Sequence, residues 1–389
     1  MAVHKLPAFP PPHVGATAWS VVLDESGQAS LRPGISPTVP HAIAWGSFTD
    51  AINETGWAIL DLHSSAAEDG HMQGYGVGFL EGALTHIRIS QHRGNMWGTD
   101  FGQRTPGCAP EPIKEFISLN LKWMWEHVRQ YRSDPYWQIL GFLLTQLRGL
   151  TDGYNAARRP NEPALPEHEM LVMSLLDADM DDLMTALVAH GQFVNEHFRH
   201  HHRTGPRGHC SALVQVAQRN ADLWVGHNNW DSYRAMLRMV KYLDMPLPGA
   251  ISQRMVFTSN PGSLYSGDDF YVIDSGLTVL ETTITNYNKS LWSIINPQTV
   301  LTWARTMVAN RLANTGALWT ETHSRYLSGT CNNQWIVVDN KRFAPGQPLL
   351  SDMLWILETM PGHARRADAT NVLIEQGSWP SYNIPYFQV

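Results

Sequence analysis

The order of strand-like and helical segments limits the fold of this chain more than any other feature of its sequence. Short runs rich in Val, Ile, Thr and aromatic residues come first, helical patterns follow from about residue 75 to 190, and strand-like runs return from residue 211 onward. A doubly wound parallel sheet needs strands and helices that alternate one by one, and this chain lacks that alternation. The sequence therefore predicts an α+β fold with helices packed outside antiparallel sheets.

The first half of the chain is expected to hold four strands and a helical block. Two strands should flank the turn Ser26-Gly27, and two more lie within residues 41–65. Apolar periodicity and helix-start signals predict helices over about 75–94, 111–131, 135–150 and 166–190, the third of them beginning at the capping pair Asp134-Pro135.

Two local patterns in this half carry weak functional signals. The glycines at 74, 76 and 78 do not have the spacing of a dinucleotide-binding fingerprint. The acidic run Asp177–Asp182 resembles a calcium loop but lacks the Gly at its sixth and the Glu at its twelfth position, so a solvated helix face is the better interpretation.

The second half reads mainly as strands. Residues 211–217 and 222–228 flank a hairpin turn, and further strands are expected over 254–260, 269–275 and 277–285. Helices are expected over 231–244 and from Asn296-Pro297 to about residue 313. The segments "QWIVVDNKRF", "MLWILETMPG" and "WPSYNIPYF" should add strands and turns.

Charge and hydropathy exclude some classes of protein. The net charge of -7 and the lack of a dense Lys/Arg run argue against nucleic-acid binding. No stretch approaches 18 apolar residues, so integral membrane association is not expected, and no apolar signal-peptide region is visible near the N-terminus. These observations leave the cellular compartment undecided.

Cys210, one of only three cysteines, stands between a flexible Gly-Pro-Arg-Gly connector and an apolar strand. If the bond between His209 and Cys210 breaks, the thiol and a new α-amine belong to one residue, which then serves as nucleophile and base together. The alternative is that Cys210 is a small buried apolar residue, as lone cysteines often are.

Several stretches resemble the phospholipase B-like (lamina-ancestor-like) family of N-terminal-nucleophile hydrolases. The stretches are "AWGSFTDAINETGWAILDL", "DMDDL", "GHCSALVQVAQRNADLWVGHNNWDSYRAMLRMVKYLD", "SGDDFYVIDSGLTVLETTI", "TCNNQWIVVDNKRF" and "WPSYNIPYF", which occur in the family's order over about residues 40–387. The resemblance implies a four-layer αββα sandwich of two antiparallel sheets flanked by helices. It also implies self-cleavage into residues 1–209 and 210–389, which stay together as one globular unit.

The resemblance also implies roles for individual residues. Cys210 would be the nucleophile and the new N-terminus. The remaining expected catalytic residues are His227, Asn228, Asn229, Thr282, Thr283, Asn332 and Asn333, with Trp230 at the substrate. One of the two asparagines at 332 and 333 would donate an amide N–H to the oxyanion, and the choice between them stays open.

Each of these residues also has a structural interpretation. His227 could end a strand, the asparagines could be turn residues, and the threonines could simply be strand formers. Cys331 stands where the family usually has an aromatic residue, which would bring a second thiol near the site.

The histidines at 197, 200, 201 and 202 lie just before the expected cut. Their spacing could present imidazoles for zinc, but no HExxH motif or matching carboxylate accompanies them, so a solvated connector is favoured and neither a metal nor a cofactor is expected.

Three functions remain open. The first is a hydrolase that cleaves an amide or ester bond of a small acyl or lipid substrate through a thioester on Cys210. The others are an acyltransferase with the same nucleophile and a non-catalytic binding protein on the same fold. Association into a homodimer also stays open.

Overall fold

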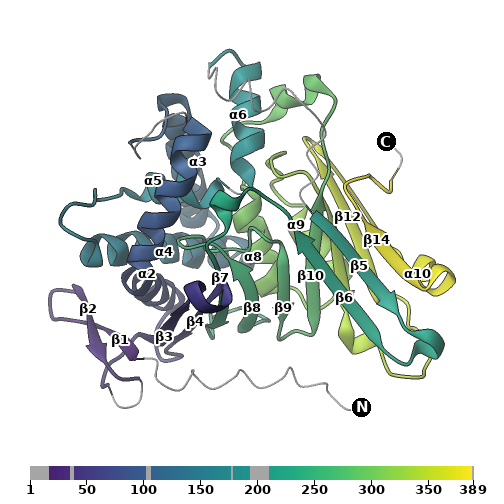
Figure 1. The fold of residues 1–389 in the computed structure, drawn as a ribbon, viewed down its shortest axis with the longest axis horizontal. Helices are drawn as coiled ribbons and strands as arrows, with labels where there is room; N and C mark the ends of the chain where they lie inside the picture. Colours follow the sequence, from purple (N-terminus) through teal and green to yellow (C-terminus); the bar gives the residue numbers. More distant parts are fainter. Residues whose placement is uncertain (1–16, 36–38, 102–106, 177, 193–209, 388–389) are drawn as a thin grey trace.

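The computed structural model describes residues 17–35, 39–101, 107–176, 178–192 and 210–387. His209 and the histidines between 197 and 202 lie outside the described residues. The described residues form an α+β structure with two sheets (Figure 1). This confirms the α+β part of the expected fold class.

The larger sheet has eleven strands in the order β13-β12-β11-β10-β9-β8-β7-β4-β3-β1-β2. Its strands are β1 (Ala18–Leu23), β2 (Ala29–Pro33), β3 (Ala44–Ala51), β4 (Trp57–Ser64), β7 (Arg238–Asp244), β8 (Arg254–Ser259), β9 (Phe270–Ile273), β10 (Leu277–Thr283), β11 (Asn333–Asp339), β12 (Leu354–Met360) and β13 (His363–Asp368). All neighbouring pairs are antiparallel except β4 and β7, which pair in parallel from Trp57 opposite Arg238 to His63 opposite Asp244.

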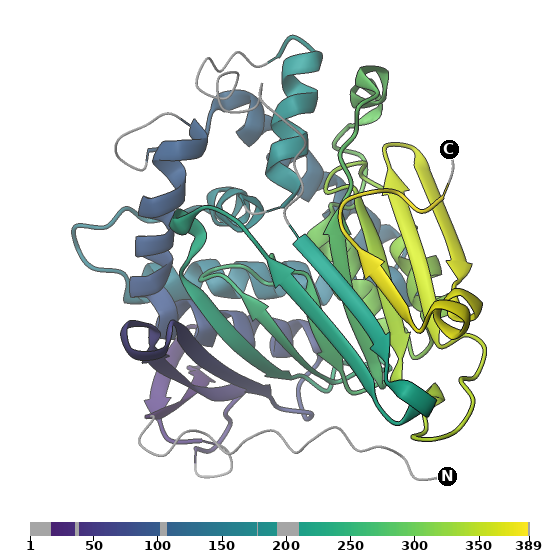
Figure 2. The same cartoon turned by 45° about the vertical axis from the view of Figure 1, so that its right-hand side comes forward.

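The smaller sheet has three antiparallel strands in the order β14-β5-β6. They are β5 (Cys210–Val216), β6 (Leu223–Asn229) and β14 (Ser378–Ser381). Figure 2 shows β5 and β6 crossing in front of the large sheet with β14 beside β5.

Most helices lie in the first half of the chain, α8 and α9 lie between β10 and β11, and α10 lies between β13 and β14. They are α1 (Ile52–Thr55), α2 (Gly70–Phe101), α3 (Glu111–Gln130), α4 (Pro135–Ala157), α5 (Glu167–Leu175), α6 (Asp179–Ala189), α8 (Thr302–Leu312), α9 (Gly316–His323) and α10 (Thr370–Gln376). Helix α2 packs on β3 and β4, and α9 packs on β11 and β12. Short 3-10 turns are η1 (Gln218–Asn220), η2 (Tyr233–Ala235), η3 (Lys289–Ile294) and η4 (Asn340–Arg342).

The large sheet is buried on both faces where it carries the small sheet. In β10, Val279 belongs to the core shared with the helices, whereas Leu280 belongs to a second core with Val214 and Trp379 of the small sheet. Successive side chains of a strand point to opposite faces, so one strand contributes to both cores. The entirely buried β11 explains the continuous apolar run "WIVV".

The layers of helix, large sheet and small sheet agree with part of the expected sandwich. The outer face of β5 and β6 is open to solvent within the described part of the chain, where Leu213 is 40% and Trp224 is 55% exposed. The expectation of purely antiparallel sheets is wrong at the β4 and β7 pair.

Three predicted elements need correction. Residues 231–244 are not a helix: η2 is followed by strand β7, whose alternating burial suits a strand between β4 and β8. The helix expected over 166–190 is split into α5 and α6, and α8 begins at Thr302 rather than just after Asn296. The cap at Asp134 is confirmed, because its side chain accepts a hydrogen bond from Tyr136 N.

The expectation that the acidic run Asp177–Asp182 forms a solvated helix face is wrong at Asp179. Asp179 is fully buried, and its carboxylate accepts hydrogen bonds from the backbone N–H groups of Thr302 and Trp303 and from the Thr330 hydroxyl. A residue of the first half of the chain therefore caps helix α8 of the second half.

Candidate active site

Cys210 is the first residue of β5, and its thiol lies between the two sheets. Strand alternation puts Cys210, Ala212 and Val214 on the buried side of β5. Cys210 is only 2% exposed and stands directly opposite Asn229 of β6. Its Sγ donates to Asn229 Oδ1 at 3.7 Å, which is a weak thiol hydrogen bond.

A chain of polar contacts leads from this thiol to the large sheet. Asn229 Nδ2 donates to Asp268 Oδ1 at 2.7 Å, and the guanidinium of Arg238 lies 3.2 Å from the same oxygen. Arg238 also donates to Asn260 Oδ1. The Asn229 amide is thereby fixed with its oxygen toward Cys210.

His227 lies on the same buried side of the hairpin, opposite Ala212. Its Nε2 donates to the backbone carbonyl of Glu281 at 2.9 Å. Burial lowers the pKa of His227, so the ring is neutral at pH 7 and its tautomer is set by that carbonyl. The histidine thus links β6 to β10 beside Cys210.

Two buried carboxyl groups that were not predicted from the sequence lie near the Cys210 thiol. Glu281 of β10 and Asp269, before β9, share a side-chain hydrogen bond. Burial and the charge of Asp268 raise the pKa of Asp269 to about 7, although its hydrogen bond to Glu281 acts in the opposite direction. Burial and the charge of Asp269 hold the pKa of Glu281 well above its usual range. The pair therefore retains a shared proton at neutral pH.

The same surroundings keep the Cys210 thiol protonated. Burial raises the pKa of Cys210 far above its ordinary value, and the charges of Glu281, Asp269 and Asp268 act in the same direction. Burial also raises the pKa of Cys331, and the charges of Asp269, Asp179 and Glu281 act in the same direction, so the pair of Asp269 and Glu281 affects both thiols. A nearby positive charge would be needed to favour a thiolate at Cys210.

The two threonines end β10 on opposite faces. Thr282 faces the small sheet, where its hydroxyl lies 2.6 Å from the Ser381 hydroxyl of β14. Thr283 pairs with Asn333, and its carbonyl accepts a hydrogen bond from Asn383. Thr282 is thus tied to the last residue of β14, and Thr283 is tied to the segment that follows β14.

The two asparagines before and at the start of β11 differ in their hydrogen bonds. The side-chain amide of Asn332 donates to Asp182 Oδ2 and to the Gly329 carbonyl. The amide of Asn333 donates to Cys331 Sγ at 3.3 Å. Asn332 therefore uses both of its N–H groups inside the protein.

Two expected site residues point away from Cys210. Asn228 lies on the exposed side of β6, and Trp230, which is 55% exposed, follows the strand. The structure does not bring either side chain to the thiol.

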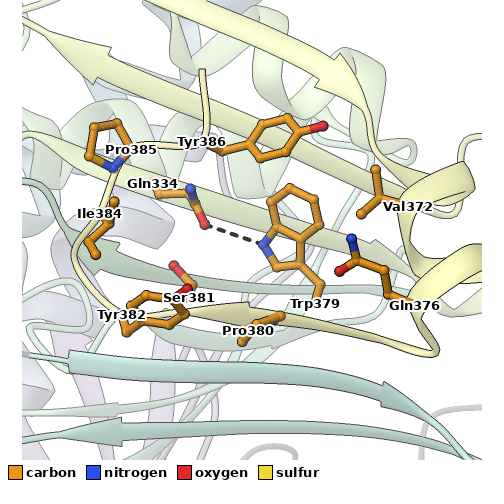
Figure 3. Close-up of a pocket in the computed structure, with 10 residues that line it drawn as sticks. All are labelled: Gln334, Val372, Gln376, Trp379, Pro380, Ser381, Tyr382, Ile384, Pro385 and Tyr386. Atoms are coloured by element: carbon orange, nitrogen blue, oxygen red, sulfur yellow. Dashed lines mark hydrogen bonds between the residues drawn. The ribbon is translucent and has the colours of Figure 1, made fainter. Parts of the chain in front are cut away.

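A pocket of about 230 Å³ adjoins this region, on the other side of β14 (Figure 3). Its lining residues are Gln334, Val372, Gln376, Trp379, Pro380, Ser381, Tyr382, Ile384, Pro385 and Tyr386. Figure 3 shows the Gln334 carboxamide accepting a hydrogen bond from the Trp379 indole at the back of the pocket. The pocket contacts the candidate site through Ser381, the partner of Thr282.

The segment that follows β14 lines this pocket and is held in place by a buried carboxylate. Glu358 of β12 accepts hydrogen bonds from Gln334 Nε2 and from the backbone N–H groups of Tyr386 and Phe387. Glu358 was not predicted from the sequence, because no local pattern marks it.

None of the helices in the described ranges is long and apolar enough to cross a membrane. No group of three or more His, Cys, Asp or Glu side chains within the same ranges could hold a metal ion.

Comparison with known proteins gives matches along nearly the whole chain. The sequence model of the family described as Phospholipase B matches residues 44–389. "Putative phospholipase B-like 2" of Mus musculus is 38% identical over 397 residues, covering 97% of this chain and 64% of that protein. "Phospholipase B-like protein B" of Dictyostelium discoideum is 35% identical over 352 residues, covering 89% of this chain and 61% of that protein. The chain spans a little under two thirds of the length of these relatives.

Proposed function

This chain belongs to the phospholipase B family, and we propose that it is a hydrolase that cleaves its own chain before Cys210 and then uses the freed residue on an acyl substrate. The observation that carries the proposal is the position of Cys210. The thiol is held at the first residue of a sheet strand, among His227, Asn229 and buried acids, directly after the segment that would be cut.

Self-cleavage begins with the thiol of Cys210. Sγ attacks the carbonyl carbon of His209, the C–N bond breaks as the nitrogen takes up a proton, and a thioester joins the two parts. Water then hydrolyses the thioester, which leaves a carboxylate on His209 and a free α-amine and thiol on Cys210. The same residue gains a base within reach of its nucleophile.

Catalysis then reuses the same atoms. The α-amine takes the thiol proton, Sγ attacks the acyl carbonyl, and the ammonium returns a proton to the leaving group as the acyl thioester forms. Water releases the acid from the thioester. Asn333 is the better oxyanion donor, because Asn332 spends both amide N–H groups on Asp182 and Gly329, whereas within the described residues Asn333 donates one N–H, to Cys331 Sγ.

The pocket beside β14 supports an acyl or lipid substrate. Aromatic, proline and aliphatic side chains dominate its lining, and Lys, Arg, Asp and Glu are absent from that lining among the described residues. Because Gln334, Gln376 and Ser381 add polar atoms to these walls, a neutral group with both apolar and hydrogen-bonding atoms fits them. The names of the similar proteins agree with a lipid-related substrate, and the ester or amide nature of the bond follows from neither observation.

A denaturing gel and intact mass of the purified protein test this function. Wild type should give residues 1–209 and 210–389, that is 209 and 180 residues, the second beginning with Cys210. Cys210→Ala should stay whole and inactive, and Cys210→Ser should be cut slowly and retain little activity, because a hydroxyl is the weaker nucleophile.

Cys108→Ala is the matched control, because Cys108 is an exposed thiol. It should be cut and act like wild type. A wild-type chain that stays whole yet hydrolyses acyl substrates would show that the terminal-amine mechanism is wrong.

A further inference from the structure

Asp268 holds a buried carboxylate oxygen that lacks a donor. The residue is 6% exposed, and its Oδ1 is occupied by Asn229 and Arg238. Its Oδ2 is buried and has no hydrogen-bond partner among the described residues. Native proteins rarely leave such an atom unpaired, because its desolvation is not compensated.

The new terminus of Cys210 would be a donor in the right place. Asn229 touches both sides: its Oδ1 accepts from the Cys210 thiol and its Nδ2 donates to Asp268. The thiol and the carboxylate are thus one amide group apart. Cleavage converts the backbone nitrogen of Cys210 into an ammonium with three N–H donors.

We propose that Asp268 anchors the α-ammonium of Cys210 after the chain is cut and so sets the pH above which that amine acts as a base. This inference rests on the proposed self-cleavage. Asp268 is a positioning residue in this scheme: it acts on substrate only through Cys210.

The sign of the effect follows from the charges that face Cys210 and Asp268. These groups are His227 of β6, Arg238 of β7, Glu281 of β10, Asp269 before β9 and Asp231 after β6. The Asp268 carboxylate favours the ammonium, and Arg238 partly offsets it. Removing the carboxylate should lower the pKa of the amine, and removing the guanidinium should raise it.

The alternative is that Asp268 only braces Asn229 and Arg238. Loss of these contacts would lower activity or stability but would leave the pKa of the terminal amine unchanged. The pH dependence of the amine therefore separates the two roles.

The experiment measures acetylation of the Cys210 α-amine by acetic anhydride across pH 5–10, with the N-terminal peptide of the 210–389 fragment quantified by mass. The wild-type midpoint should lie above the ordinary range of about 7.7–8.0. Asp268→Asn should lower the midpoint by about one pH unit or more, and Arg238→Met should raise it. Asp231→Asn is the control, since Asp231 is exposed and its charge has a smaller effect on Cys210 than those of Glu281, Asp269 and Asp268, so the midpoint should stay nearly unchanged.

Equal midpoints in wild type and Asp268→Asn would overturn the anchor. Should Asp268→Asn fail to fold, Arg238→Met decides, because it keeps the carboxylate: an unchanged or lowered midpoint would again overturn the proposal. A wild-type chain that is not cut refutes the self-cleavage itself. A specific protease site placed directly before Cys210 then supplies the terminus, so the two proposals can fail separately.

Discussion

The residues between the two sheets show which parts of the candidate site could be predicted from local sequence patterns. The motif around Cys210 and His227 predicted two residues that the structure brings to the same side of one hairpin. The alternation of β6 also explains why Asn229 faces the thiol while Asn228 faces solvent. Asp268 and Glu281 could not be predicted, because their burial depends on strands that are distant in sequence.

His63 gives a pH-dependent contribution to stability at the residue scale. Its ring lies 3.1 Å from an Asp61 oxygen and 3.7 Å from an Asp244 oxygen. Burial alone would lower the pKa of His63, but the hydrogen bonds to Asp244 and Asp61 raise it to about 9. Because the folded-state pKa lies above 6.5, the contribution is complete below pH 6.5 and is lost as the pH rises to 9.

Thermal unfolding of wild type and His63→Gln between pH 6 and 9.5 tests this expectation. The free energy of unfolding of wild type should exceed that of the variant by on the order of 2 kcal/mol near pH 6, and this difference should decrease toward pH 9. A difference that stays constant over this range would contradict the ionic role of His63.

At the scale of elements, glycines bring α2 and α4 into backbone contact. A Cβ at Gly74, Gly78 or Gly82 would overlap the carbonyl oxygen of Phe142, Gln146 or Leu150. Gly149 and Gly153 of α4 meet α2 in the same way. Gly74 and Gly78 of the series that lacks a dinucleotide fingerprint are thus explained by helix packing, whereas Gly76 lies close to the side chains of Ile43 and Ala44.

Gly78→Ala should therefore lower the free energy of unfolding by about 3 kcal/mol, because the new methyl group meets the backbone of α4 and cannot be accommodated by a rotamer change. Gly94→Ala, in the same helix but with open space around its Cα, should be neutral or stabilising. Denaturant unfolding of both variants provides the comparison, and equal destabilisation would argue against the close packing.

The elements that were predicted wrongly from the sequence are all determined by contacts with distant parts of the chain. Strand β7 was expected to be helical because its apolar residues suit either period over so short a run, and its pairing with β4 and β8 decides the outcome. The end of α5 and the start of α8 depend on tertiary contacts such as the capping of α8 by Asp179, which lies far away in the sequence. The hairpin of β5 and β6 was predictable because its signals are local.

At the scale of the whole molecule, one sheet joins both sides of the proposed cut. Strands β1 to β4 precede residue 209, strands β7 to β13 follow it, and the parallel β4 and β7 ladder connects them. The α+β class was predictable from the order of segments, whereas this junction was not, because it pairs strands separated by the entire helical block.

The two fragments should consequently stay together after cleavage. Size-exclusion chromatography without denaturant should give one species that a denaturing gel resolves into two bands. Separate elution of the fragments would be inconsistent with the shared sheet.

Asp179→Ala should weaken the same assembly. The change leaves the buried N–H groups of Thr302 and Trp303 without their acceptor, and it should cost about 3–5 kcal/mol. Asp181→Ala, on a less buried position of the same helix turn, should have a much smaller effect on the thermal midpoint. Similar losses in the two variants would count against the cap as a link between the fragments.

The parallel ladder between β4 and β7 also makes the protein divisible at the level of the gene. Strands β1 to β4 are encoded in one continuous stretch of the gene, and strands β7 to β13 are encoded in another. The two halves can therefore be expressed from two separate reading frames. A second frame that begins Met-Cys210, with its initiator methionine removed, would supply the terminal cysteine directly. The chemistry of maturation would then be replaced by the assembly of two polypeptides along one row of backbone hydrogen bonds.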